Sequence, residues 1–181
     1  IYLEIWKEIL KKYNLIIDDN FYNHFIKGKS DAFFLKYLLS EISDEEIIEL
    51  SILKDHKFIE YINLNKMNIL HENVTEFLEK NKNKKISIVT SCNRKAAEFL
   101  INYTNMNEYI NLIISADDCK NHKPDPEPYL KAINKLKVKK ENCIIFEDSL
   151  SGYKSAVNAE IKNISLKINI IPAQCTTIPF C

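Results

Sequence analysis

The chain has 181 residues, of which 46% are apolar and 28% are charged, so it can bury the core of an ordinary domain. The formal net charge is zero, with neither a basic surface nor a long apolar run, and we therefore expect no nucleic-acid or membrane partner. The five cysteines are widely spaced and form no CxxC motif, which predicts reduced thiols in a cytoplasmic protein.

The first part of the chain, residues 1–72, predicts helices throughout. Apolar side chains recur at helical spacing near the start, at Ile5, Trp6, Ile9, Leu10 and Tyr13. Ser30 can cap a second helix, and the Ser-Asp-Glu-Glu run at 43–46 has the pattern of a capping box that opens a third. Since no strand pattern interrupts them, we expect residues 1–72 to form an all-helical cap domain.

From residue 73 onward, strand and helix patterns alternate. The β-branched run at 86–90 (ISIVT) predicts a short strand buried on both faces. Predicted elements then follow in order: helix 95–103, strand 112–115, helix 126–136, strand 143–146, helix 151–158 and strand 163–166. This alternation is typical of α/β domains with a parallel, Rossmann-like sheet flanked by helices, which we expect over 73–181. Pro172 and Pro179 argue against a long regular element in the tail from 168 to 181.

The residues just after each predicted strand carry the chemistry, because open parallel sheets bind ligands beyond the carboxyl ends of their strands. Thr90 and Ser91 follow the first strand, Lys123 follows the second, and Glu147 and Asp148 follow the third. Hydroxyl groups and a lysine suit a phosphate, and paired carboxylates suit Mg²⁺. The pattern predicts a metal-assisted phosphoryl site.

Each of these residues also has a structural interpretation. Thr90, Ser91 or Asn93 could simply cap the helix that follows, and the acidic pair could be solvated. Lys123 alone would be an ordinary surface lysine. The run HKPDPEPY at 122–129 holds three of the five prolines, and Asp125-Pro126 is an ordinary helix start. The preceding Lys-Pro step, however, favours extended backbone and is not explained by a helix start.

Several stretches resemble the haloacid dehalogenase (HAD) superfamily, in its branch of phosphatases and beta-phosphoglucomutase-like proteins with a helical cap. SIVTSCNR is similar to the second motif of the family, HKPDPEPY to the third, and CIIFEDSLSGYKSA to the fourth. FIKGKSDAFFLKYLL resembles the stretch where the cap meets substrate. The chain has one arginine, Arg94, and two glycines, and both glycines (Gly28 and Gly152) fall on family positions.

The resemblance implies a role for each of these residues. Thr90 and Lys123 would act in catalysis and bind phosphate together with Ser91 and Asn93, and Glu147 and Asp148 would hold Mg²⁺. Weaker candidates for substrate contact are Gly28, Lys29, Ser30 and Arg94. The prolines of the third motif would set an extended turn that directs Lys123 into the site. The implied activity is a Mg²⁺-dependent phosphatase acting on a small phosphorylated metabolite, and we expect a monomer.

The first motif of the family, a strand ending in Asp-x-Asp, is absent from the 181 residues. It supplies the nucleophile and the acid/base, and its strand would lie centrally, between the strands that end at Thr90 and Glu147. Glu160 also replaces a usual glycine. Because the chain begins at Ile1 without methionine, we expect a fragment of a longer enzyme, inactive alone, although a degenerate relative with a rearranged core would also fit.

Three other functions remain open. A HAD-like shell could bind phosphate ligands or a partner without turnover, which makes a pseudoenzyme the main alternative. A phosphomutase of the same family would need an extra cap contact, which the sequence does not identify. A generic doubly wound domain, such as a response-regulator-like module, would leave the helical first part and the Lys-Pro-Asp-Pro run unexplained.

Overall fold

A computed structural model describes residues 1–27, 29–70, 73–166 and 178–180. The chain divides into two compact units, Ile1–Asn68 and Ile69–Cys181, which are treated separately below. Gly28, a predicted substrate contact, and most of the tail at 168–181 lie outside the described residues. In the described part of the chain, no helix combines the length and apolarity that crossing a membrane requires.

The first unit is built from helices, and its described residues contain no strand. The elements are α1 (Tyr2–Leu10), η1 (Lys11–Tyr13), α2 (Asp19–Phe21), η2 (Tyr22–Ile26), α3 (Asp31–Leu38) and α4 (Asp44–Asn65). The predicted caps form: Ser30 accepts a hydrogen bond from Phe33 N, and Ser43 accepts one from Glu46 N. The apolar face of α1 is buried, and Trp6 packs edge-on against Phe34 at 4.7 Å between ring centroids.

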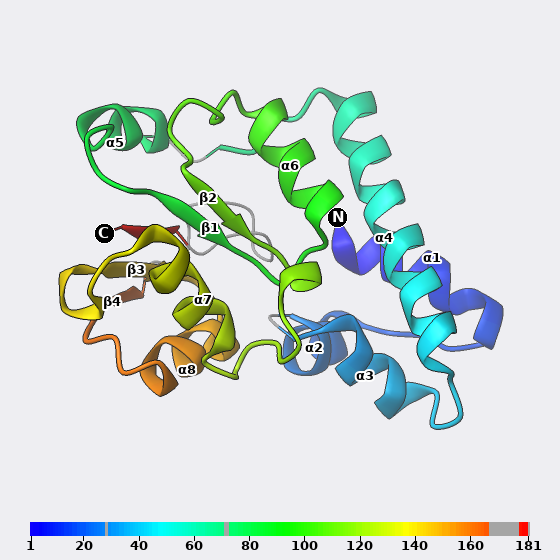
Figure 1. The fold of residues 1–181 in the computed structure, drawn as a ribbon. Helices are drawn as coiled ribbons and strands as arrows, with labels where there is room; N and C mark the ends of the chain where they lie inside the picture. Colours follow the sequence, from blue (N-terminus) through cyan, green and yellow to red (C-terminus); the bar gives the residue numbers. More distant parts are fainter. Residues whose placement is uncertain (28, 71–72, 167–177, 181) are drawn as a thin grey trace. The chain divides into compact units, whose positions relative to one another are not determined.

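The second unit alternates strands and helices (Figure 1). Its elements are α5 (Val74–Lys80), β1 (Ser87–Val89), α6 (Arg94–Tyr103), β2 (Leu112–Ile114), η3 (Ala116–Asp118), α7 (Glu127–Leu136), η4 (Lys140–Asn142), β3 (Ile144–Glu147), α8 (Leu150–Asn158), β4 (Asn163–Leu166) and β5 (Ile178–Phe180). Every strand and helix expected between 86 and 166 is present, and its ends differ from the prediction by at most one residue.

Two parallel strand pairs make up most of the sheet structure. β1 pairs with β2, with Ile88 opposite Ile113, and β3 pairs with β4, with Ile145 opposite Ile164. β1 and β3 do not pair with each other. The short strand β5 pairs antiparallel with β3 and also lies against β1. A strand from the C-terminal end of the chain therefore lies on the edge of β3 where the family resemblance implies a central parallel strand.

The strands of the second unit are covered on both faces. Ile88 packs into a cluster with Ile101 and Met106, whereas the next residue, Val89, packs into a second cluster that contains Tyr129. All three residues of β1 are buried, as the β-branched run predicts. Cys92 and Cys119 are free thiols, but Cys143 is disulfide-bonded, so the prediction that every cysteine is reduced is wrong at Cys143.

Candidate active site

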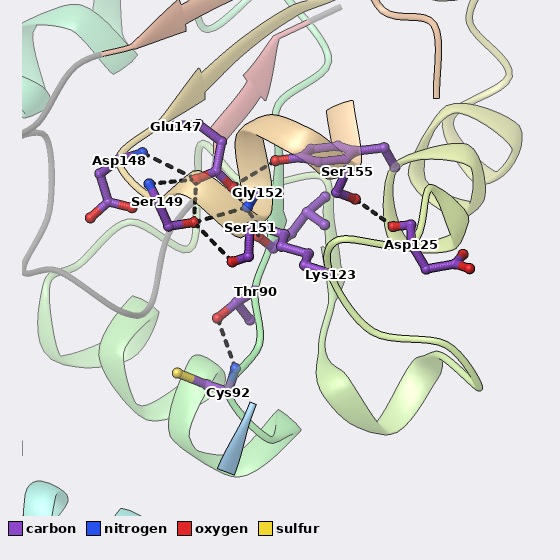
Figure 2. A network of polar contacts seen from close by, with 12 residues as sticks. Thr90, Cys92, Lys123, Asp125, Glu147, Asp148, Ser149, Ser151, Gly152 and Ser155 are labelled. Atoms are coloured by element: carbon purple, nitrogen blue, oxygen red, sulfur yellow. Dashed lines mark hydrogen bonds and ion pairs between the residues drawn. The ribbon is translucent and has the colours of Figure 1, made fainter. Parts of the chain in front are cut away.

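Thr90 sits where β1 ends and the chain turns toward α6. Its backbone N–H continues the pairing with β2 by donating to Ile114 O at 2.8 Å. Its hydroxyl accepts a hydrogen bond from Cys92 N at 3.0 Å, and the residue is 5% exposed (Figure 2). The turn is therefore folded around the Thr90 side chain, which holds this hydroxyl at the carboxyl end of the strand.

Asn93, and neither Thr90 nor Ser91, is the cap of α6. Its side-chain oxygen accepts from Ala96 N at 2.8 Å, which satisfies one of the unpaired N–H groups of the first turn. Ser91 is exposed on the same turn. The three candidate residues thus lie together between β1 and α6, and Asn93 has a capping role in addition to the phosphate contact predicted for it.

Lys123 is not a surface lysine, because its side chain is only 6% exposed. The ammonium donates to Val89 O at 3.0 Å and to Glu147 Oε1 at 2.6 Å. Val89 directly precedes Thr90, and Glu147 directly precedes Asp148. One buried cation therefore connects the carboxyl ends of β1 and β3, which are the two strand ends where the sequence places its candidate phosphate and metal ligands.

The HKPDPEPY run makes a tight turn and then opens a helix. The Lys123-Pro124 peptide bond is cis, and Asp125 N donates to His122 O at 2.9 Å. Proline then lies at the start of α7, where its missing N–H costs no helical hydrogen bond. The Ser155 hydroxyl on α8 donates to Asp125 O at 2.6 Å, which links the turn to α8. This turn places Lys123 against the strand ends.

Glu147 is 2% exposed, and donors surround both of its oxygens. Oε1 accepts from the ammonium of Lys123 and from the Tyr129 hydroxyl at 2.8 Å. Oε2 accepts from the backbone N–H groups of Asp148 and Ser149, each at 3.1 Å, and from Ser149 Oγ at 2.9 Å. Both oxygens of Glu147 therefore have hydrogen-bond partners within the protein, and its role as a Mg²⁺ ligand stays a prediction.

Gly152 makes room for this carboxylate. A β carbon built on residue 152 would lie 1.8 Å from Glu147 Oε1 and 2.0 Å from its carboxyl carbon. Contacts this short cannot be relieved without moving Glu147, which its donors hold in place. Glycine is therefore required at position 152 because the Glu147 side chain approaches its α carbon closely, and not because the backbone is left-handed.

Asp148 is half-buried at the start of the turn into α8 (Figure 2). The next residue, Ser149, caps α8 by accepting from Gly152 N at 3.0 Å. Among the described residues, no group of three or more His, Cys, Asp or Glu side chains could hold a metal ion. Asp148 nevertheless fits Mg²⁺, because this ion is commonly bound through one or two carboxylates, water and substrate phosphate.

Arg94, a weaker candidate for substrate contact, forms hydrogen bonds and ion pairs with protein groups. Its guanidinium forms an ion pair with Asp118 and donates to Ile113 O at 3.1 Å. The backbone N–H of Arg94 donates to Asp117 Oδ2 at 2.7 Å. Burial alone would raise the pKa of Asp118, but hydrogen bonds from Ser115 and the charge of Arg94 outweigh burial and lower it. Arg94 therefore joins the start of α6 to the loop after β2, and its contact with substrate stays a prediction.

The remaining predicted contacts lie in the first unit. Ser30 caps α3, and the exposed Lys29 places its ammonium 4.6 Å from the ring centre of Phe33 and 5.9 Å from that of Phe25. Gly28 is outside the described residues. These residues belong to a different compact unit from Thr90, Lys123 and Asp148, and their contact with substrate stays a prediction.

Sequence reasoning did not single out Tyr129, Ser149 or Glu127. Tyr129 lies at the end of the HKPDPEPY run, but its spacing is that of an ordinary core residue of a helix, so nothing in the sequence marks it. Ser149 has a detectable signal, because a serine just before a predicted helix is a common helix cap. Glu127 accepts from the N–H groups of Lys120 and Asn121 at 2.9 and 2.8 Å. These bonds, with help from Lys131, lower the pKa of Glu127 to about 2.

Comparison with known proteins agrees with this fold. Residues 1–166 match the family model for haloacid dehalogenase-like hydrolases. A phosphorylated carbohydrates phosphatase of Thermotoga maritima is 37% identical over 100 residues, covering 53% of this chain and 46% of the relative. The pyrophosphatase PpaX of Halalkalibacterium halodurans is 36% identical over 78 residues, covering 43% of this chain and 36% of the relative. The chain thus spans less than half the length of either curated relative.

A solved structure shares the fold of the chain. The beta-phosphoglucomutase of Clostridium difficile superposes with a TM-score of 0.72 at 24% identity, covering 93% of this chain and 84% of that protein. At this identity the likeness shows the fold alone. The family model covers nearly the whole chain, and the structure contains the α/β unit and the helical unit that the motifs imply. The chain belongs to the haloacid dehalogenase-like hydrolase family.

Proposed function

We propose that this chain carries the phosphate- and Mg²⁺-binding part of a phosphatase that acts on small phosphorylated metabolites. The observation that supports this best is the position of the Lys123 ammonium, which contacts both Val89 O, beside Thr90, and the Glu147 carboxylate, beside Asp148. A buried cation between a hydroxyl-bearing strand end and an acidic strand end suits a phosphate that is shared with a metal ion.

Each residue would have a distinct task in phosphate binding. The Thr90 hydroxyl and the nearby N–H groups of the turn into α6 would donate to phosphate oxygens, with Ser91 on the exposed side of the turn. Lys123 would neutralise part of the phosphate charge. Asp148 would hold Mg²⁺, which supplies further positive charge for the transferring group when it is bound.

The relatives suggest which substrates to test. One curated relative is named for phosphorylated carbohydrates and the other for pyrophosphate, and both ligands present a terminal phosphate. A suitable assay measures phosphate release from sugar phosphates, nucleoside monophosphates and pyrophosphate, with and without Mg²⁺. Because no Asp-x-Asp occurs in the 181 residues, the assay uses the protein made from its complete reading frame.

Two variants make the assay specific for this site. Lys123→Ala and Asp148→Asn should each lower kcat/KM by at least about 100-fold, the usual range for losing one charge-stabilising group. Lys84→Ala, at an exposed lysine with no predicted role in the site, is the comparison for a change of surface charge. Phosphate release by Lys123→Ala at the wild-type rate would reject the proposal.

A second candidate is a phosphate-binding protein without turnover. A complete reading frame without Asp-x-Asp would favour it, because the family resemblance assigns catalysis to those aspartates. It predicts that inorganic phosphate binds in the presence of Mg²⁺ while no substrate in the panel is hydrolysed. Hydrolysis that depends on Asp148 would exclude this candidate.

A further inference from the structure

Tyr129 on α7 has a hydroxyl that packing alone does not require. The residue is 1% exposed and lies in the apolar cluster that also contains Val89 and Ile145. A phenylalanine ring would fill the same space without a polar atom. The Tyr129 hydroxyl instead donates to Glu147 Oε1 at 2.8 Å, as a buried tyrosine hydroxyl is expected to find a partner.

The same carboxylate oxygen also receives the Lys123 ammonium, at 2.6 Å. Lys123 Nζ in addition lies 5.1 Å from the centre of the Tyr129 ring. Tyr129 therefore contacts both members of the buried ion pair: it shares the negative charge of Oε1 and offers its ring face to the cation. The hydroxyl of Tyr109, by contrast, donates to the exposed Glu79 at 3.1 Å.

Glu147 has little freedom to move in response to its partners. Its other oxygen is held by the backbone N–H groups of Asp148 and Ser149 and by Ser149 Oγ. On the remaining side, the α carbon of Gly152 is so close that a β carbon would overlap the carboxylate. A fixed carboxylate acts as an anchor, so the position of the Lys123 ammonium depends on what else shares Oε1.

We propose that Tyr129 is a positioning residue for Lys123, acting through Glu147, and that Glu147 is the internal anchor of that lysine and not a Mg²⁺ ligand. With the hydroxyl present, Oε1 divides its charge between two donors and the ammonium keeps positive potential for an external anion. Without the hydroxyl, Lys123 alone neutralises Oε1 and is drawn onto it. The identity of the anion, phosphate, rests on the proposed function.

The test compares Tyr129→Phe with the matched control Tyr109→Phe, each made in the protein from its complete reading frame. Each substitution removes one tyrosine hydroxyl that donates to a glutamate, but only Tyr129 touches Lys123. The first readout is the NMR signal of the Lys123 ammonium in ¹⁵N-labelled protein, identified by its loss in Lys123→Arg. We expect this signal to shift in Tyr129→Phe and to stay in place in Tyr109→Phe.

The second readout is the affinity for inorganic phosphate in the presence of Mg²⁺, measured by titration calorimetry. Tyr129→Phe removes a hydrogen bond to the charged Glu147, and part of that loss acts on Lys123. We therefore expect phosphate binding to weaken on the order of fivefold in Tyr129→Phe, with no change in Tyr109→Phe. The proposal that Glu147 does not bind Mg²⁺ is tested by the affinity for Mn²⁺, measured by electron paramagnetic resonance. This affinity should fall in Asp148→Asn and persist in folded Glu147→Gln.

The possible results separate the two proposals. An unmoved Lys123 signal in folded Tyr129→Phe overturns the positioning role, and loss of Mn²⁺ binding in folded Glu147→Gln overturns the anchor role. Wild-type protein that binds no phosphate with Mg²⁺ rejects the proposed function, whereas the ammonium signal still decides the role of Tyr129. If Tyr129→Phe does not fold, 3-fluorotyrosine in the wild-type chain serves instead: its hydroxyl is a stronger donor and should move the Lys123 signal, and an unchanged signal overturns the role.

Discussion

Replacing Lys123 by methionine tests the buried ion pair that connects β1 to β3. The substitution keeps a chain of similar length but leaves the carboxylate of Glu147, whose side chain is 1% exposed, without its cation. Removing one partner of a buried pair typically costs about 3–5 kcal/mol of the free energy of unfolding. Since Tyr129, Ser149 and backbone N–H groups still donate to Glu147, we expect the lower end, about 3 kcal/mol.

Native-state hydrogen exchange measures this loss of unfolding free energy in the second compact unit separately from the first. A change of about 3 kcal/mol corresponds to roughly 150-fold faster exchange of the most protected amides, because 1.36 kcal/mol is a factor of ten. We expect this acceleration at β1 and β3 and little change at α1 and α4, which belong to the other compact unit. The fluorescence of Trp6, the one tryptophan of the chain, reports that other unit and is the internal control.

A double variant completes the test. In Lys123→Met/Glu147→Gln neither charge remains, so the two single effects should not add, with a coupling of about 2 kcal/mol. Unchanged exchange at β3 in Lys123→Met, or single effects that add fully in the double variant, would refute the claim that this pair holds the two strand ends together.

Three further predictions concern residues around the site. Gly152→Ala should destabilise the second unit by about 1–3 kcal/mol in urea unfolding, because the β carbon overlaps Glu147; the stabilisation usual for alanine in a helix would contradict this. Asp118→Asn should lower the free energy of unfolding in urea by about 1–3 kcal/mol, since Ser115 and Arg94 lose a charged acceptor, and an unchanged free energy would show that this link is dispensable. Glu127 has a pKa of about 2, below its usual value, so it contributes stability that is complete above about pH 4.5 and is lost toward pH 2. The free energy of unfolding of Glu127→Gln should therefore depend less on pH across that window. An unaltered pH dependence would count against this prediction.

The sequence predicts the regular elements of the second unit well because local signals agree there. The β-branched run before Thr90 is buried on both faces, and the proline before Glu127 starts α7 as expected. The strand ends then follow from parallel topology, which explains why the sequence predicts that Thr90, Lys123 and Glu147 lie near one another.

Contacts between distant segments could not be predicted in the same way. Nothing local distinguishes Arg94 as a partner of Asp118 from a ligand for an anion, because the deciding acid lies on a different loop. The occupied carboxylate of Glu147 likewise depends on Tyr129, far along the chain, and on the empty space at Gly152. The position of β5 beside β3 also requires long-range pairing that its own three residues do not specify.

The most direct test of the account is a crystal structure of the protein from its complete reading frame, grown with Mg²⁺ and inorganic phosphate. The account predicts a phosphate within about 3 Å of both Thr90 Oγ1 and Lys123 Nζ, the distance of a hydrogen bond, with Mg²⁺ on Asp148. Phosphate bound at another surface, or Mg²⁺ bound by carboxylates that do not include Asp148, would contradict it.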